Sequence, residues 1–177
     1  MKTIPNGQVE AVLGKNSFWL PKALVKLDYL YGLPELDTFQ ENNKIQCLII
    51  KCLPNGLEIG LLYAMSKYSV GIPYSGIKHI ELALPEEIIT KTKENRSVIG
   101  RAIVGGLLLG PVGAIVGGMS GLKDGEKAEK TEVGDALLTI SIEQEGQESF
   151  IVAKVPNSQR SLTKAYLQNN LKRFLLN

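Results

Sequence analysis

The sequence has few of the residues from which catalytic and metal centres are built, with two cysteines and one histidine among 177 residues. Cys47 and Cys52 are five positions apart, which places them on opposite faces of a strand, so we expect small core residues without a mutual disulfide. His79 lies within a predicted strand, where a hydrogen-bonded, partly buried imidazole is more usual than a general base. Neither a Ser–His–acid arrangement nor a cluster of metal ligands is evident in the sequence. We therefore predict a non-enzymatic protein without cofactor or metal, and an enzyme that uses His79 is kept only as a third alternative.

The sequence also lacks a strong charge of one sign, since its formal net charge is +2. Because no basic cluster with interleaved aromatic residues occurs, we expect no nucleic-acid partner. Residues 1–7 contain Pro5 and form no apolar segment, so no secretory signal is expected. Together with the unpaired cysteines, these features predict a cytoplasmic protein.

The sequence does contain one long segment without charge. Between Arg101 and Lys123 no charged residue occurs, and Ser120 is the only polar side chain. We call residues 97–122 the glycine-rich run. Small residues recur there at every fourth position, in one series of Ala102, Gly106, Gly110, Ala114 and Gly118 and a second of Gly113, Gly117 and Gly121. Each glycine costs a helix about 1 kcal/mol relative to alanine, whereas small residues at this spacing let two helices approach closely.

On both sides of the run the residues alternate as they do in strands. Expected strands cover residues 22–33, 44–53, 57–63, 68–73, 75–84, 138–142 and 150–155. Asn55 and Gly56 lie between two apolar segments and predict a tight hairpin with both residues at positive φ. Residues 9–13 are interpreted as an edge strand, and the polar, acidic residues 34–43 as a loop.

The C-terminal part predicts an amphipathic helix over residues 159–176, with Ser158 as its N-cap. Its expected apolar face holds Leu162, Ala165, Tyr166, Leu167, Leu171, Phe174 and Leu175. We expect Leu171 and Phe174 to be buried and Lys172 and Arg173 to be exposed.

This order of elements resembles the bacterial pleckstrin-homology-like (PH-like) domains. The resemblance rests on the hairpin at Asn55 and Gly56, the segment IPYSGIKHIEL at residues 72–82, the terminal helix after Ser158 and the glycine-rich insert. It implies a mainly β fold, in which antiparallel strands form a partly open barrel and a C-terminal α-helix plugs one end. The implied organisation is a lead-in over residues 1–21 and a PH-like domain over 22–176, interrupted by the run at 97–122.

The resemblance does not extend to a phosphoinositide site. Members that bind phosphoinositides use paired basic residues around the first hairpin loop. Here that loop carries Glu35, Asp37 and Glu41.

Gly110 and Pro111 interrupt the middle of the run and predict a turn between two short helices, over about residues 100–109 and 112–121. A single membrane crossing would place strands of one barrel on opposite sides, so the run should return to the side from which it starts. In such a hairpin Ala102, Gly106, Gly113, Gly117 and Gly121 would face the partner helix. Outward-facing residues would be Leu107, Leu108, Leu109, Ile115 and Val116.

Three interpretations of the run stay open: a hairpin that dips into a membrane, a hairpin folded on the barrel or on a second subunit, and a disordered loop. A nucleotide-binding loop is disfavoured, because no Gly-Lys-Ser/Thr follows the glycines. We predict a non-enzymatic PH-like binding module on the inner face of the cell membrane, associated through the run and binding a lipid or a protein segment. The alternative is a soluble protein-interaction module whose run mediates homo-oligomerisation.

Overall fold

The computed structural model describes residues 2–16, 24–84, 135–144 and 146–176. Within them, seven antiparallel strands form a sheet in the order β4-β3-β2-β1-β7-β6-β5. The strands are β1 (Leu24–Tyr31), β2 (Cys47–Leu53), β3 (Gly56–Tyr63), β4 (Ser66–Pro73), β5 (Ile77–Ala83), β6 (Ala136–Gln144) and β7 (Gln147–Val155). The described helices are α1 (Val9–Leu13), α2 (Pro34–Asn42) and α6 (Arg160–Asn170), with short 3₁₀ turns η1 (Tyr74–Gly76), η4 (Asn157–Gln159) and η5 (Lys172–Phe174).

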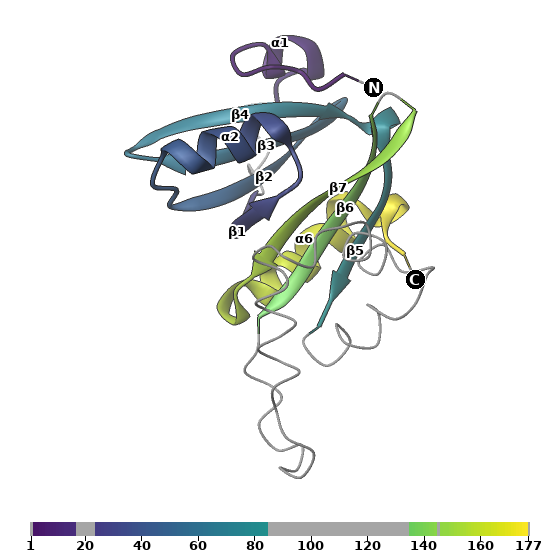
Figure 1. Ribbon diagram of the computed structural model, residues 1–177. Coiled ribbons are helices and arrows are strands. Elements are labelled where there is room, and N and C mark those ends of the chain that lie inside the picture. The colour runs from purple at the N-terminus through teal and green to yellow at the C-terminus, as the bar shows by residue number, and fades with distance from the viewer. Residues whose placement is uncertain (1, 17–23, 85–134, 145, 177) are drawn as a thin grey trace.

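The sheet curls into a partly open barrel. Its two edge strands, β4 and β5, are consecutive in the chain and are joined by η1, so both edges start from one corner. Strand β1 connects the two halves, because Leu24 to Leu27 pair with β2 whereas Asp28 to Tyr31 pair with β7. Figure 1 shows the resulting layers, with β2, β3 and β4 on one side and β5, β6 and β7 on the other. The predicted mainly β, PH-like architecture is confirmed.

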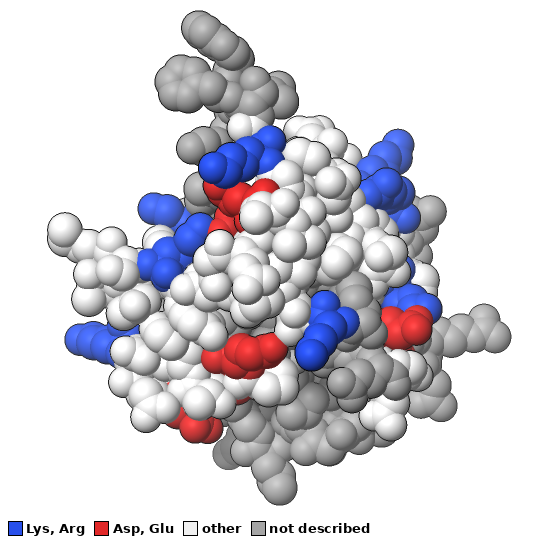
Figure 2. Space-filling view, turned by 90° about the horizontal axis from the view of Figure 1, so that it is seen from above, with Lys and Arg blue, Asp and Glu red and all other residues white. Residues whose placement is uncertain are grey.

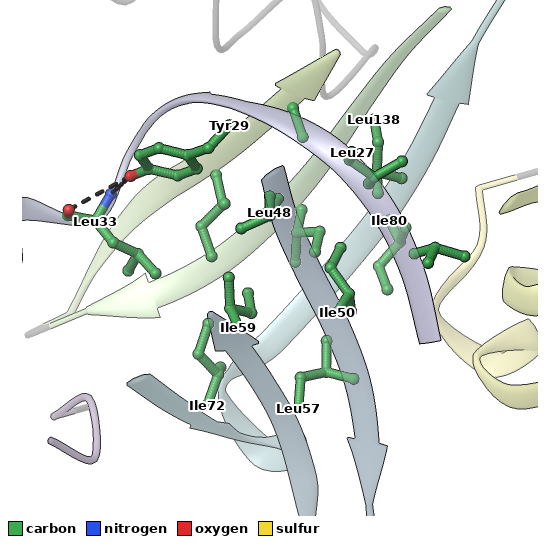
Figure 3. Close-up of a cluster of buried hydrophobic side chains, with 14 of the residues drawn as sticks. Leu27, Tyr29, Leu33, Leu48, Ile50, Leu57, Ile59, Ile72, Ile80 and Leu138 are labelled. Carbon is green, nitrogen blue, oxygen red and sulfur yellow. Dashed lines mark hydrogen bonds between the residues drawn. The ribbon is translucent and has the colours of Figure 1, made fainter. Parts of the chain in front are cut away.

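The core fills the space between these layers. Alternate residues of the strands point inward, among them Leu27, Leu48, Ile59, Ile72 and Ile80, each fully buried (Figure 3). Helix α6 plugs the barrel through other buried side chains of the same cluster, which are Tyr166, Leu167 and Leu171.

The terminal helix is shorter than predicted, and its buried face differs. It ends at Asn170 and is followed by η5, and its N-cap is Gln159, because Asn157 to Gln159 form a 3₁₀ turn. Leu162 is 57% exposed and Ala165 is exposed, whereas Thr163 is fully buried. Leu171 is buried and Lys172 and Arg173 are exposed, as predicted, but Phe174 is only partly buried and stacks on Tyr74.

Residues 34–43, predicted as a loop, form helix α2. Pro34 occupies the first turn and Glu35 and Asp37 follow it, as is favourable at a helix N-terminus. The side chain of Leu36 is buried, and Phe39 packs against the core. The spacing of these two apolar residues is helical, and the polar composition obscured it.

Residues 9–13, predicted as an edge strand, form helix α1. The strand-like contact in this lead-in is made instead by Ile4, whose backbone exchanges two hydrogen bonds with Gly71 at the edge of β4 (2.9 and 2.8 Å). Together with Val9, Leu13 and Leu53, Ile4 forms a second apolar cluster on the outer face of β2–β4. Gly71 permits this packing, because a Cβ there would lie 2.9 Å from Leu13 Cδ1.

The hairpin predicted at Asn55 and Gly56 is present, but its turn is displaced by one residue. Pro54 and Asn55 form the turn, and Gly56 already pairs with Leu53 as the first residue of β3. Gly56 is needed because a Cβ would lie 2.3 Å from the carbonyl oxygen of Ile72. Positive φ angles at both turn positions occur instead at Ala64 and Met65, between β3 and β4.

Candidate functional site

Every residue singled out in the glycine-rich run lies outside the described residues. These are Ala102, Gly106, Leu107, Leu108, Leu109, Gly110, Pro111, Gly113, Ile115, Val116, Gly117 and Gly121, and the proposed hairpin turn and its two helices lie there with them. Within the part of the chain that is described, no helix has both the length and the apolar character to cross a membrane. The site is therefore built from the strands that flank the run.

Strands β5 and β6 hold side by side the two ends of the segment between Leu84 and Asp135, which contains the glycine-rich run. Their antiparallel ladder extends to Leu82 opposite Leu138 and Ala83 opposite Leu137. Paired strands lie about 5 Å apart, so the chain leaves the barrel after Leu84 and returns at Asp135 on the same edge. A segment with both ends fixed at one edge cannot cross a bilayer once.

The outer face of β5, β6 and β7 is closed from solvent along most of its length. Inward residues such as Ile140 and Ile151 belong to the barrel core, so their alternating neighbours point outward. The outward set of Glu81, Ala83, Leu137, Thr139, Ser141 and Val152 is nevertheless between 0% and 6% exposed. We call these six residues the outer patch.

One polar group of the outer patch is hydrogen-bonded across the strands. His79 on β5 lies opposite Ser141 on β6, and the Ser141 hydroxyl donates to the Glu148 carboxylate on β7. The histidine is exposed, which corrects the prediction of a partly buried imidazole. Ser141 is fully buried, so a substrate in solvent does not reach its hydroxyl in this arrangement.

A β-bulge explains why His79 is exposed. Ile77 pairs with Ile142 and His79 with Ser141, which leaves Lys78 as an extra residue. The bulge restores Ile77 and Ile80 to the core and leaves Lys78 and His79 both exposed. Strict alternation over residues 77–84 could not reveal this shift.

An open pocket of about 270 Å³ lies beside His79, at the end of the β6–β7 hairpin. Its lining consists of Lys78, His79, Glu143, Gly146, Gln147 and Glu148. Lys78 and Glu143 form an ion pair across it, which lowers the pKa of Glu143. Among the described residues, no group of three or more His, Cys, Asp or Glu side chains is placed to hold a metal ion.

The acidic residues that the sequence places in the first loop lie in α2, and one of them holds this helix in place. Asp37 accepts a hydrogen bond from the Tyr29 hydroxyl (2.6 Å) and one from the Gly32 backbone N–H (3.1 Å), so it anchors α2 to β1. Burial, with Asp37 as hydrogen-bond partner, raises the pKa of Tyr29. Figure 2 shows basic and acidic side chains interspersed, without a continuous basic area on the face in view.

A buried carboxylate lies beneath the N-terminal segment, on the other half of the barrel. Glu58 is 2% exposed and forms ion pairs with Lys67 and with Lys51 (3.4 Å), and Ser69 donates to it (3.0 Å). Burial opposes its ionisation, but the hydrogen bonds and charges of these neighbours outweigh that effect and lower the pKa of Glu58. Glu10 of α1 pairs with Lys51 as well (3.0 Å), which ties the helix to the barrel.

The cysteines are free, as expected, but neither is fully buried. The Cys52 sulfur accepts a hydrogen bond from the Tyr166 hydroxyl (3.1 Å), and the Cys52 N–H donates to the same hydroxyl (2.9 Å). Burial raises the pKa of both thiols. Their chemistry is therefore that of packing residues rather than of activated nucleophiles.

Sequence patterns did not identify the outer patch. Thr139 and Ser141 look like the solvent side of an alternating strand. A signal was available in the consecutive apolar residues at 136–138 and 150–153, because apolar side chains on both faces indicate a strand that is covered on both sides.

A family model described as "Glycine zipper containing PH domain" matches residues 37–154, more than half of the chain. The matched range extends from α2 to β7 and includes the whole glycine-rich run. Comparisons with curated proteins and with solved structures gave no significant match.

Proposed function

The chain belongs to the family of glycine zipper containing PH domains, and from this premise we propose that it is a non-catalytic binding module that associates with a membrane through its glycine-rich run. PH-like domains are generally binding modules for lipids or proteins. The family match supports that general role. Membrane association, a location on the inner face of the cell membrane and any particular lipid are our proposals.

The pairing of β5 with β6 is the observation that carries this proposal. It supports a run that enters and leaves at one edge of the barrel, so each direction has half of the uncharged residues 102–122, about ten, available. As a helix, ten residues span about 15 Å, which is half of the roughly 30 Å hydrocarbon layer. A run without charge between Arg101 and Lys123 fits insertion to that depth, with basic residues kept at the surface.

Vesicle flotation tests this function. The full chain and a variant with residues 99–121 replaced by a polar linker are mixed with phosphatidylcholine–phosphatidylglycerol vesicles. We expect the full chain to float and the variant to remain at the bottom. Binding should survive about 1 M NaCl, where the Debye length is only about 3 Å, because it depends on apolar insertion rather than on charge.

Homo-oligomerisation through the run is the alternative outcome. The spacing of small residues at every fourth position suits a second copy as well as a second helix of the same chain. The same two proteins are compared by light scattering during gel filtration. The full chain could stay at the bottom of the flotation gradient and still form larger assemblies than the linker variant. In that case self-association, not membrane binding, would be the function of the run.

A further inference from the structure

The residues of the outer patch are buried, although none of the described helices or strands lies on this face of the sheet. Glu81, Leu137, Thr139, Ser141 and Val152 point away from the barrel core, yet each has lost at least nine-tenths of its exposure. On the same face Lys154 remains partly exposed and His79 exposed. The burial thus has a boundary, as expected where another segment lies on part of a sheet.

The described helices pack elsewhere. Helix α1 lies against β3 and β4, and α2 lies against β1 and β4. Helix α6 plugs the barrel, and the C-terminal residues lie along the free edge of β5, where the Leu176 N–H donates to the Ile80 carbonyl (3.1 Å). Figure 1 shows the same arrangement, with α1 and α2 on the β2–β4 half.

We propose that the glycine-rich run of the same chain is the occupant of the outer patch. Between β5 and β6 the chain outside the described ranges starts after Leu84 and ends before Asp135, and Ala83 and Leu137 of the patch are the neighbouring pair of the ladder. The segment that contains the run therefore starts and ends beside the patch, with residues 85–96 and 123–134 connecting the run to the two strands. Residues 102–122 are its uncharged part, whereas the flanking stretches carry charges that suit solvent.

Apart from the Glu81 carboxylate, the chemistry of the patch matches that occupant. Ala83, Thr139 and Ser141 are small, so the face is shallow and lets a backbone approach. Glycines and alanines at every fourth position offer an equally shallow surface, and close contact of small residues is how such segments pack. Leu137 and Val152 supply apolar area, worth about 25 cal/mol for each Å² removed from water.

Docking on the barrel and insertion into lipid exclude each other for the same residues. If the run binds membranes, which rests on the proposed function, docking on the outer patch and insertion into lipid are two alternatives for the same residues. A ligand shifts such an equilibrium only through its different affinity for the two states. The docking itself does not depend on membrane binding.

Thiol labelling of the full chain tests the docking. Thr139→Cys places a thiol in the patch, and Lys154→Cys places a comparison thiol at a partly exposed position of the same face. Labelling with N-ethylmaleimide is followed at each peptide by mass spectrometry, so that Cys47 and Cys52 can stay in place. We expect Thr139→Cys to react at least about tenfold more slowly than Lys154→Cys, and the difference to vanish when residues 99–121 are replaced by a polar linker. Ser141→Cys, which is nearly isosteric, repeats the test at a second buried position.

Each other result overturns the proposal. Rapid labelling in the full chain would mean that the patch is open, and slow labelling in the linker variant would mean that another part of the chain covers it. Protection that disappears on dilution would assign the cover to the run of a second copy. Flotation is scored separately, so a protected patch without vesicle binding refutes the membrane function but supports the docking.

Discussion

Ala83 and Leu137 lie opposite each other in the β5–β6 ladder, although the whole glycine-rich run separates them in the sequence. This pairing completes the ladder at the point where the chain leaves the barrel. All seven described strands, and the core between them, are built from residues on either side of the run. The run is thus an insertion between two neighbouring strands rather than a link between two domains.

Removal of the run should therefore leave a folded barrel. We expect a chain without residues 97–125 to unfold in one cooperative thermal transition, because a loop of changed length alters the closure entropy by only about 0.6 kcal/mol per doubling. The midpoint should fall, since the outer patch would be exposed. Circular dichroism during heating provides the measurement, and the absence of any cooperative transition would contradict the insertion.

Tyr29 and Tyr31 provide a matched test of how α2 is held. The Tyr29 hydroxyl accepts a hydrogen bond from the Leu33 N–H (2.9 Å) and donates to Asp37. Tyr29→Phe leaves that buried N–H without this partner and should lower the free energy of unfolding by about 1–3 kcal/mol. The Tyr31 hydroxyl is buried without a partner among the described residues, and burial raises the pKa of Tyr31 to about 12.

Tyr31→Phe should consequently leave the free energy of unfolding unchanged or raise it slightly, because the lost hydroxyl made no hydrogen bond. Urea titration of both variants gives the comparison. Equal losses in the two would show that ring packing, not the hydroxyl of Tyr29, positions α2.

The strands could be predicted because their period of two is visible in the sequence and because alternate residues of the strands enter the barrel core. Where the structure departs from the pattern, a local backbone feature is responsible. The bulge at Lys78 changes which residues of β5 face the core. The positive φ angles at Ala64 and Met65 occur without the Asn-Gly pair that would predict such a turn.

Helices α1 and α2 were harder to predict than α6, because short segments take their structure from what they cover. Helix α1 has five residues and is held by Leu53 and Gly71 of the sheet. In α2 the start signals at Pro34 and Glu35 were present, but the acidic composition favoured a loop. The register between β6 and β7, which brings Ser141 to Glu148, has no signal in a single sequence.

Glu58 should make the free energy of unfolding of the barrel depend on pH in the acidic range. Its pKa is lower in the fold than the ordinary value of 4.5, so it contributes stability above that value and loses it as pH falls through the folded pKa. Glu58→Gln removes the charge that Lys51 and Lys67 share, and at pH 7 it should cost about 1–3 kcal/mol. Its free energy of unfolding should then decline less on acidification than that of the parent chain.

Glu143→Gln is the control for this comparison. Glu143 also pairs with a lysine, Lys78, but both side chains are about half exposed, and ion pairs in contact with solvent contribute little. Urea titrations at neutral and acidic pH measure all three proteins. A Glu58→Gln curve parallel to that of the parent chain would show that other carboxylates cause the acid sensitivity.

Leu171 and Leu162 distinguish the buried side of the terminal helix from its exposed side. Leu171 is fully buried after the last turn of α6, and Leu162 is exposed in its first turn. We expect Leu171→Ala to lower the free energy of unfolding by about 2–5 kcal/mol, through lost burial and the cavity left behind. Leu162→Ala should change it by less than about 0.5 kcal/mol. Similar losses in both, measured by urea titration, would mean that the helix does not plug the barrel as a fixed element.

The glycine-rich run itself can be tested by exchanging small and large residues along it. If two segments of the run pack closely through their small residues, Gly106→Leu and Gly117→Leu should separate them, because no side chain fits such a contact. Leu108→Ala should leave the packing intact and weaken binding to vesicles, since it removes apolar area that faces lipid. Cysteine pairs placed along residues 102–109 and 113–121, with Cys47 and Cys52 replaced, report the packing directly, because a disulfide needs Cα atoms within about 7 Å. Three substitutions with identical effects on flotation, together with no crosslink at any pair, would refute the close packing of two segments and favour a disordered loop, and the membrane proposal would then rest on flotation alone.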